Sequence, residues 1–129
     1  LIYPATHFSL ETNSHHKFAK GYLLTRDAQA WYHENYLRSD ADRENWWASP
    51  ALAADFTDVA PAFVLTCGYD PLLDEGRAYF EQLKSAGVPT TYRCFEGQVH
   101  GFITMGKVIN DANEAVYDVA DKVCEAFSV

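Results

Sequence analysis

The chain has 129 residues, of which 48% are hydrophobic and 22% are charged, a composition typical of one globular domain that can bury a core. Its formal charge of −8, from 18 acidic and 10 basic residues, argues against nucleic acid or an anionic membrane surface as a partner, so we expect a small neutral or apolar one. No apolar run is long enough to span a membrane, and the three cysteines form neither a disulfide framework nor a zinc motif, so we expect reduced thiols and a cytoplasmic location.

The opening of the chain has the pattern of a strand end followed by an irregular segment. Leu1, Ile2 and Tyr3 are apolar, and Pro4 ends a strand because it has no N–H to donate. This opening, without an initial Met, indicates a chain that begins inside a larger fold. Several histidines follow without the spacing of metal ligands, so we expect a solvated loop and no metal site: His7, His15, His16 and His33.

One helix and one long loop are expected between residues 25 and 58. Thr25 can cap a helix that ends near Leu37. Four side chains recur there at helical spacing: Ala28, Trp31, Tyr32 and Tyr36. Residues 39–58 show no sustained period, so we expect a loop with at most one short helical turn.

The second half of the chain begins with a strand and a helix. Residues 62–67 form a continuous apolar run of strand length. The apolar spacing from Leu72 to Ala86 predicts a helix, and Gly87 is its stop signal.

A second strand and a second helix complete the chain. An alternating pattern predicts the strand over residues 90–95. The last helix is expected to open at Asp111, which has capping-box spacing to Glu114. Its apolar stripe is expected to face the core: Ala112, Ala115, Val116, Val119, Ala120, Val123, Cys124 and Phe127. The order strand, helix, strand, helix predicts an α/β fold with a parallel sheet.

A carboxylate and an imidazole follow the two predicted strands. Asp70 comes after the first strand and His100 after the second. Because the carboxyl ends of parallel strands meet at one edge of a sheet, we expect these two side chains to lie together. A carboxylate that orients an imidazole base is part of the Ser-His-Asp relay. No serine of this chain lies in a Gly-x-Ser-x-Gly frame, so the nucleophile is expected elsewhere.

Each of these residues also has a structural interpretation. Asp70 precedes Pro71 as an N-cap precedes the first residue of a helix, and His100 lies next to a glycine as a turn residue does. Two further carboxylates, Asp74 and Glu75, are expected to point along the helix and to favour its dipole.

The second half of the chain resembles the hormone-sensitive lipase family of α/β-hydrolase esterases. The motif Asp-Pro-Leu-Leu-Asp-Glu-Gly at residues 70–76 is followed, after a helix, by His-Gly-Phe at residues 100–102. Residues 1–4 and 21–28 resemble the segment after the sixth strand of that family, so the similarity covers essentially the whole chain.

This resemblance implies the C-terminal part of one α/β-hydrolase domain over residues 1–129. Residues 5–58, approximately, would be associated with the lid and the pocket, and residues 59–129 would carry the acid and the base. Asp70 would be the triad acid and His100 the triad base. Four residues would lie near the acyl or alcohol pocket: Tyr22, Leu23, Leu24 and Trp31. The family's oxyanion loop, His-Gly-Gly-Gly, and its nucleophile motif, Gly-Asp-Ser-Ala-Gly, are absent from this sequence.

Two functional hypotheses follow. In the first, the chain is part of a serine carboxylesterase for short-acyl esters that needs no cofactor, and it is inactive alone because the serine lies in a missing part of the polypeptide or on another chain. In the second, it is a non-catalytic hydrolase module that associates with itself or a partner through an exposed sheet edge. A nucleotide-binding unit is disfavoured because the sequence has no Gly-x-Gly-x-x-Gly or Walker loop.

Overall fold

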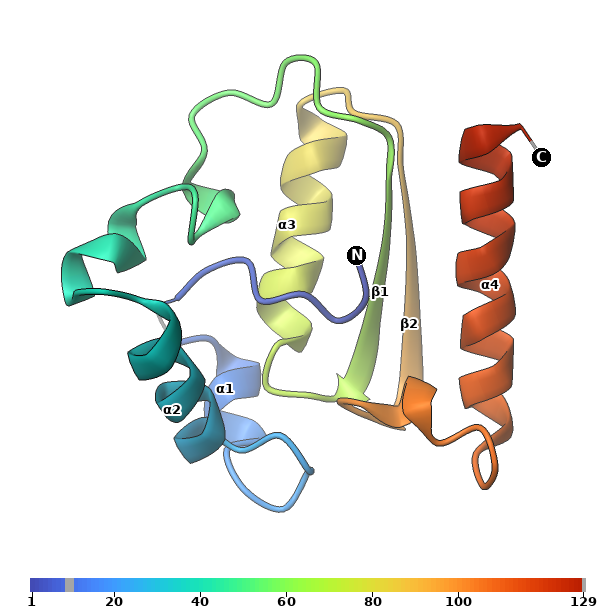
Figure 1. Cartoon of the computed structure of the whole chain (residues 1–129), viewed down its shortest axis with the longest axis horizontal. Helices are drawn as coiled ribbons and strands as arrows, with labels where there is room; N and C mark the ends of the chain where they lie inside the picture. Colours follow the sequence, from blue (N-terminus) through green and yellow to red (C-terminus); the bar gives the residue numbers. More distant parts are fainter. Residues whose placement is uncertain (9–10, 129) are drawn as a thin grey trace.

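Two parallel strands form the centre of the computed structural model, which describes residues 1–8 and 11–128. Ser9, one of the serines without a nucleophile motif, lies outside the described residues. Strand β1, Ala62–Tyr69, pairs along its length with strand β2, Thr90–Val99. Helix α3, Leu73–Ser85, connects them (Figure 1). The predicted strand-helix-strand order and the parallel sheet are confirmed.

The first residues of the chain lie along the other edge of β1. The backbone N–H of Tyr3 donates to the carbonyl of Leu65 at 2.6 Å, and the N–H of Leu65 donates to the carbonyl of Leu1 at 2.9 Å. Ile2 and Leu65 form an isolated parallel bridge. The expected strand end is therefore present, reduced to one bridge.

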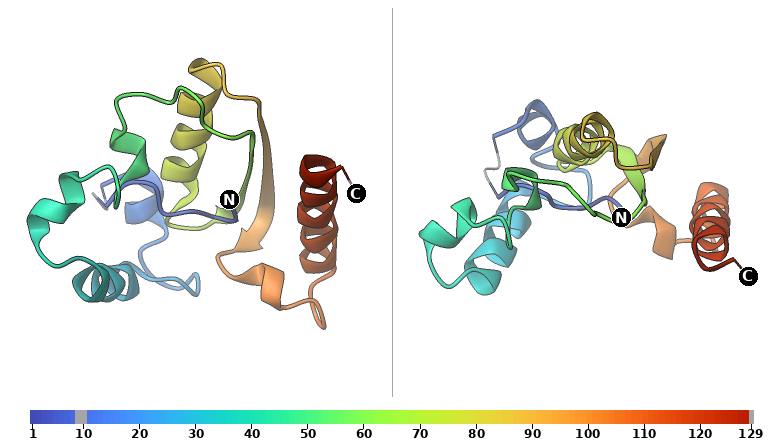
Figure 2. Two further views of the ribbon diagram at one scale, coloured as in Figure 1. Left: turned by 45° about the horizontal axis from the view of Figure 1, so that its top comes forward. Right: turned by 90° about the horizontal axis from the view of Figure 1, so that it is seen from above.

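Helices α3 and α4 cover opposite faces of the sheet (Figure 2). Helix α4, Asn110–Phe127, begins with Ile109 as its N-cap and without a side-chain cap. The capping box predicted for Asp111 and Glu114 was wrong. Strand β2 continues to Val99, beyond its expected end, and brings the side-chain amide of Gln98 to within 2.8 Å of the Asp111 carboxylate, which accepts its hydrogen bond.

Only the first half of α4 packs tightly against the sheet. The buried cluster on that face consists of Leu65, Cys67, Phe95, Phe102, Ala112 and Ala115. Further along the predicted stripe, Val116 and Val123 are each 49% exposed and Phe127 is 75% exposed, so the expectation of a core-facing stripe fails there. An apolar groove of about 550 Å³ lies instead between the end of α4 and the starts of both strands.

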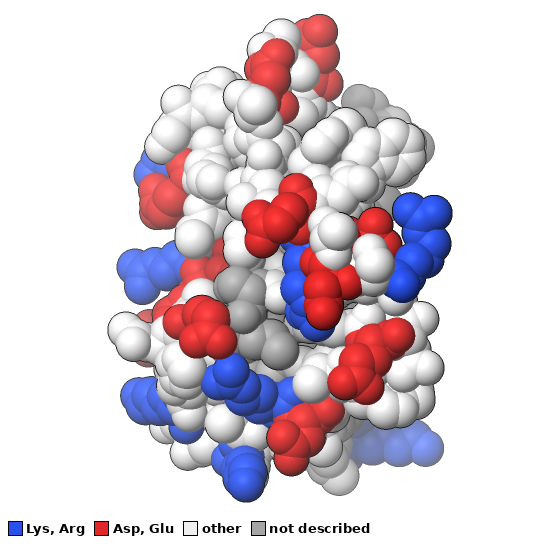
Figure 3. Space-filling model, turned by 90° about the vertical axis from the view of Figure 1, so that its left-hand side faces the viewer, with Lys and Arg blue, Asp and Glu red and all other residues white. Residues whose placement is uncertain are grey.

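Residues 11–58 form short helices beside the sheet. Helix α2, Arg26–Tyr36, starts at the predicted cap, where the Thr25 hydroxyl accepts a hydrogen bond from the N–H of Ala28. Helix α1, Asn13–Lys17, was not predicted because it is one turn long and has no apolar period. Two 3-10 turns, Asp40–Glu44 and Pro50–Leu52, occupy the region where at most one was expected. The charged side chains on this side of the molecule are mixed in sign, without a continuous basic patch (Figure 3).

Candidate active site

Asp70 and His100 meet at the carboxyl edge of the sheet. Asp70 directly follows β1 and is fully buried, and His100 directly follows β2. The Nδ1 atom of His100 lies 2.8 Å from Oδ2 of Asp70, within hydrogen-bond distance. The geometry is that of an acid that orients a base, while the catalytic roles of the two residues stay predictions.

The turn before α3 holds the carboxylate of Asp70. Its Oδ1 atom accepts a hydrogen bond from the backbone N–H of Leu72 at 2.8 Å, which leaves Oδ2 for His100. Helix α3 begins at Leu73 with Leu72 in the N-cap position, so Asp70 is not the cap of this helix. A buried carboxylate needs such partners, because an unpaired charge away from water is costly.

Two neighbours hold the imidazole of His100. Gly101 has a φ of 85°, in the left-handed region that favours glycine, and turns the chain into the 3-10 turn Phe102–Thr104. The ring of Tyr3 packs against the imidazole with a centroid separation of 4.3 Å. Burial, with Cys67 and Asp70 nearby, raises the pKa of the Tyr3 hydroxyl, so this wall is uncharged at neutral pH. Because Nδ1 faces the carboxylate, Nε2 is the nitrogen available for proton transfer.

A carboxylate in the first turn of α3, that of Glu75, holds the start of the chain beside this site. Glu75 is buried, and its Oε1 atom accepts hydrogen bonds from the N–H groups of Thr6 at 2.6 Å and His7 at 3.2 Å. Its Oε2 atom lies 3.1 Å from Nε2 of His15, which is also fully buried. Glu75 does lie in the first turn of α3, as expected, but the expectation that its side chain points along the helix was wrong. The expectation of a solvated loop around His15 was also wrong. No local pattern pairs residues so distant in sequence.

Hydrogen bonds between Ser14 and the start of α3 also hold the first segment of the chain against this helix. The carboxylate of Asp74 accepts a hydrogen bond from the N–H of Ser14 at 2.8 Å, and the hydroxyl of Ser14 donates to the carbonyl of Pro71 at 2.6 Å. Buried Ser49 likewise donates its hydroxyl to a backbone carbonyl, that of Arg43. Both buried serines thus make structural hydrogen bonds, and across residues 1–8 and 11–128 no serine is bonded to His100.

A cavity of about 400 Å³ lies beside His100. The residues that line it come from the start of the chain, from α2 and the residues just before it, and from the site. They include Tyr3, Leu24, Gln29, Tyr32, His33 and His100. Of the four residues predicted near the pocket, Leu24 lines this cavity and Tyr22, Leu23 and Trp31 do not. Gln29 was not predicted, and the expectation that His33 lies in a solvated loop was wrong, because it lies on α2 and is buried.

Tyr22, Leu23 and Trp31 have other surroundings. The ring of Tyr22 stacks in parallel on Tyr69, at the end of β1, with a centroid separation of 5.6 Å. Leu23 is 63% exposed, and its side chain lies near Gly101. Trp31 is also exposed and contacts Tyr32 edge to face. Tyr22 and Leu23 therefore lie next to residues that flank Asp70 and His100, and none of the three lines the cavity beside His100.

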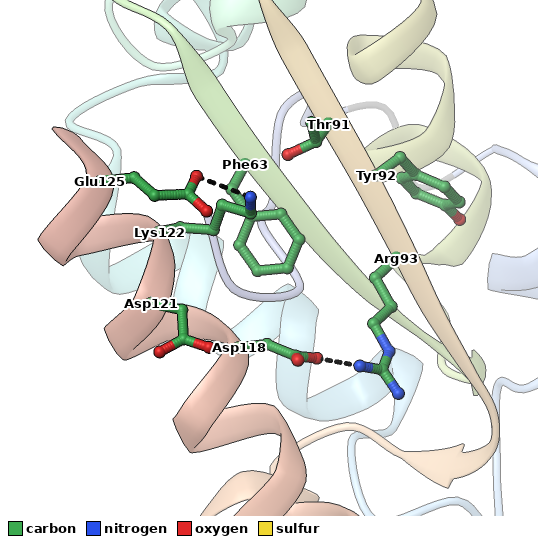
Figure 4. Close-up of a pocket in the computed structure, with 8 residues that line it drawn as sticks. All are labelled: Phe63, Thr91, Tyr92, Arg93, Asp118, Asp121, Lys122 and Glu125. Carbon is green, nitrogen blue, oxygen red and sulfur yellow. Dashed lines mark hydrogen bonds and ion pairs between the residues drawn. The ribbon is translucent and has the colours of Figure 1, made fainter.

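A separate groove of about 430 Å³ separates β2 from α4 (Figure 4). Arg93 reaches across it from β2 and bonds to the carboxylates of Asp118 and Glu114. Lys122 is bonded to Glu125 at 2.7 Å. Since both of these cations are already paired, the groove offers little attraction to a charged ligand, and it shares no lining residue with the cavity beside His100.

Two properties of the described part of the chain bear on cofactors and membranes. Residues 1–8 and 11–128 contain no group of three histidine, cysteine or acidic side chains arranged to hold a metal ion. Among the same residues, no helix has the length and apolar character needed to cross a bilayer.

Comparison with known proteins gives consistent matches to ester hydrolases. A family model described as the alpha/beta hydrolase fold matches residues 1–104. The carboxylic ester hydrolase LipN of Mycobacterium tuberculosis is 40% identical over 106 residues, which are 81% of this chain and 28% of that protein. The ethyl acetate hydrolase of Pseudomonas putida is 35% identical over 121 residues, which are 94% of this chain and 38% of that protein.

Solved structures agree with these matches. An ester hydrolase from the metagenome of Lake Arreo, complexed with a bipyridine phosphonate derivative, has a TM-score of 0.93 and 43% identity, and the match covers 100% of this chain and 41% of that one. The hyperthermophilic esterase of Pyrobaculum calidifontis has a TM-score of 0.90 and 34% identity, over 95% of this chain and 41% of that one. The chain therefore spans less than half the length of each of these relatives.

Proposed function

This chain belongs to the α/β-hydrolase family, and we propose that it supplies the acid and the base of a serine carboxylesterase. Asp70 is the acid and His100 is the base. The observation that carries the proposal is the 2.8 Å contact between the buried carboxylate and Nδ1 of the imidazole, at the ends of two adjacent parallel strands.

The proposed mechanism follows from this contact. Asp70 holds the proton of His100 on Nδ1, which leaves Nε2 unprotonated and able to accept the proton of a serine hydroxyl. The same nitrogen then returns the proton to the departing alcohol oxygen, and Asp70 stabilises the imidazolium between the two steps. The serine and the oxyanion donors are contributed by a polypeptide segment outside these 129 residues.

Short-acyl esters are the proposed substrates. The names of the relatives support this class: an ethyl acetate hydrolase of Pseudomonas putida and an acetyl esterase of Salmonella typhi, the latter 34% identical over 98 residues. The cavity beside His100, at about 400 Å³, has room for a small ester.

The test joins this chain to a serine-bearing partner. The match covers 41% of the Lake Arreo hydrolase. In the chimera, residues 1–129 of this chain replace that matched part, and the rest of the Lake Arreo hydrolase is kept. We expect the chimera to hydrolyse 4-nitrophenyl acetate and butanoate, and His100→Ala to abolish this activity. His16→Ala is the matched control, because the His16 side chain is 54% exposed. A folded but inert chimera, or one that ignores His100→Ala, would refute the proposal.

A further inference from the structure

The segment that carries Tyr3 is fixed at both of its ends. At one end, the backbone N–H of Tyr3 donates to the carbonyl of Leu65 in β1. At the other end, Oε1 of Glu75 accepts hydrogen bonds from the N–H groups of Thr6 and His7, and the hydroxyl of Thr6 donates to the backbone carbonyl of Glu75 at 3.1 Å. Thr6 is 1% exposed and Glu75 is 4% exposed, so little water competes for these bonds. Glu75 thus joins this segment to α3.

The second oxygen of the Glu75 carboxylate faces a buried imidazole. This Oε2 atom lies 3.1 Å from Nε2 of His15. The backbone N–H of Thr12 donates to Nδ1 of His15 at 3.3 Å, so the proton of this ring is on Nε2, the nitrogen nearest the carboxylate. Both ring nitrogens of His15 therefore face partners within the fold. Unlike the pair of Asp70 and His100, this carboxylate and imidazole keep no nitrogen for a substrate, so their role is to hold structure.

His100 depends on Tyr3 for part of its orientation. Its Nδ1 atom is bonded to Asp70, and one hydrogen bond fixes a ring nitrogen while the ring can still tilt about it. The side chain of His100 is 24% exposed, so the protein does not enclose it fully. The ring of Tyr3, 4.3 Å from the imidazole between centroids, restricts this tilt. A change that releases the first segment from Glu75 would therefore reach the base through Tyr3.

We propose that Glu75 is a positioning residue of the esterase: it holds the Tyr3 ring against His100 and so keeps Nε2 of the imidazole directed at the serine hydroxyl. This inference rests on the proposed function. The two buried carboxylates, one before α3 and one in its first turn, divide the task. Asp70 holds a nitrogen of the base, and Glu75 acts on the face of the ring through the start of the chain.

The first test measures kcat and KM of the chimera at a temperature at which circular dichroism shows each variant to be folded. Glu75→Ala should lower kcat roughly tenfold with little change in KM, because a misoriented base slows proton transfer more than it weakens substrate binding. Leu83→Ala is the matched control, since Leu83 is buried on the same helix about 12 Å further along its axis, and its loss destabilises the fold. This variant should keep the kcat of the unchanged chimera. Equal losses of kcat in the two variants would overturn the inference, because instability alone would then explain both.

The second test asks whether the effect of Glu75 passes through Tyr3. In a Tyr3→Ala background, Glu75→Ala should lower kcat by no more than about twofold further, since the contact that Glu75 supports is already absent. Losses that multiply would overturn the inference. Glu75→Gln keeps an acceptor for the N–H of Thr6 and takes the place of Glu75→Ala if that variant does not fold. Its smaller loss of kcat should also disappear in the Tyr3→Ala background, and a loss that persists there would count against the positioning role.

NMR of the chimera separates this inference from the proposed function, which fails if no ester is cleaved. With 13C-labelled histidine rings, and with the His100 signals assigned by His100→Gln, the ring protons of Tyr3 and His100 should show a nuclear Overhauser effect. We expect Glu75→Ala to remove this effect and Leu83→Ala to retain it. An effect that survives Glu75→Ala would overturn the positioning role, whether or not the chimera is active.

Discussion

Tyr3 and His100 lie ring to ring, with their centroids 4.3 Å apart and their planes inclined by 55°. Tyr3 has a φ of 35°, a conformation that is uncommon for a bulky side chain and costs free energy. Its backbone N–H is bonded to Leu65 of β1, so the sheet holds the strained residue in place. The start of the chain therefore forms one wall of the site, beside the ends of the two strands.

Removing the ring of Tyr3 should loosen the imidazole. In the chimera, we expect Tyr3→Ala to lower kcat about tenfold to a hundredfold with a smaller effect on KM, because His100 then samples orientations unsuited to proton transfer. Tyr3→Phe keeps the packing surface and should retain most of the activity. A loss as large in Tyr3→Phe as in Tyr3→Ala would show that the hydroxyl, and not the ring, matters.

Replacing the carboxylate of Asp70 should abolish the orientation of the base with little change in structure. Asp70→Asn keeps an oxygen for the N–H of Leu72 but presents an amide to His100, so the imidazole takes the wrong tautomer. We expect kcat to fall about 10⁴-fold, as for the same change in other Ser-His-Asp relays. Asp121→Asn, on the exposed side of α4, should not change kcat. Steady-state kinetics measure the loss of catalysis, and a thermal melt shows whether the substitution also changes the stability of the fold.

Features that depend on neighbouring residues could be predicted from the sequence. The strand-helix-strand order, the cap at Thr25 and the approach of Asp70 to His100 each follow from local patterns and one rule about strand ends. The roles of Glu75 and His15 could not be predicted, because a carboxylate in a first helical turn fits both solvent and a buried partner from another segment. The Asp111 capping box failed because α4 begins at Asn110 with Ile109 as its N-cap, so Asp111 lies inside the helix and its carboxylate accepts a hydrogen bond from Gln98 at the end of β2.

The buried contacts of Glu75 make it a test of how the start of the chain is held. Glu75→Ala leaves the N–H groups of Thr6 and His7 without their acceptor, and it removes the partner of buried His15. We expect the free energy of unfolding to fall by about 3 kcal/mol, measured by urea denaturation. Glu75→Gln keeps one acceptor oxygen and should cost less. Glu81→Ala, at an exposed position of α3, is the control and should have almost no effect.

The thiols should differ in reactivity. Burial, and the nearby Asp70 and Cys94, raise the pKa of the Cys67 thiol far above its ordinary value, whereas Cys124 is exposed. At about pH 8.5, near the pKa of a free thiol, iodoacetamide should modify Cys124 and spare Cys67 until urea unfolds the chain. Mass spectrometry of the proteolytic peptides measures the extent of modification at each cysteine. Because the folded state disfavours the Cys67 thiolate, its contribution to stability is complete below the pKa of the unfolded thiol and is lost as the pH rises above it.

The exposed half of α4 should make the isolated chain associate. Val123 and Phe127 line the apolar groove of about 550 Å³ at the starts of the strands, where no described residue covers them. Such a surface is costly in water, so we expect oligomers in size-exclusion chromatography with light scattering. Val123→Lys and Phe127→Lys should shift the 129-residue chain towards monomer, whereas Val108→Lys, at a residue that is 84% exposed outside the groove, should not. A monomeric wild-type chain would contradict this prediction.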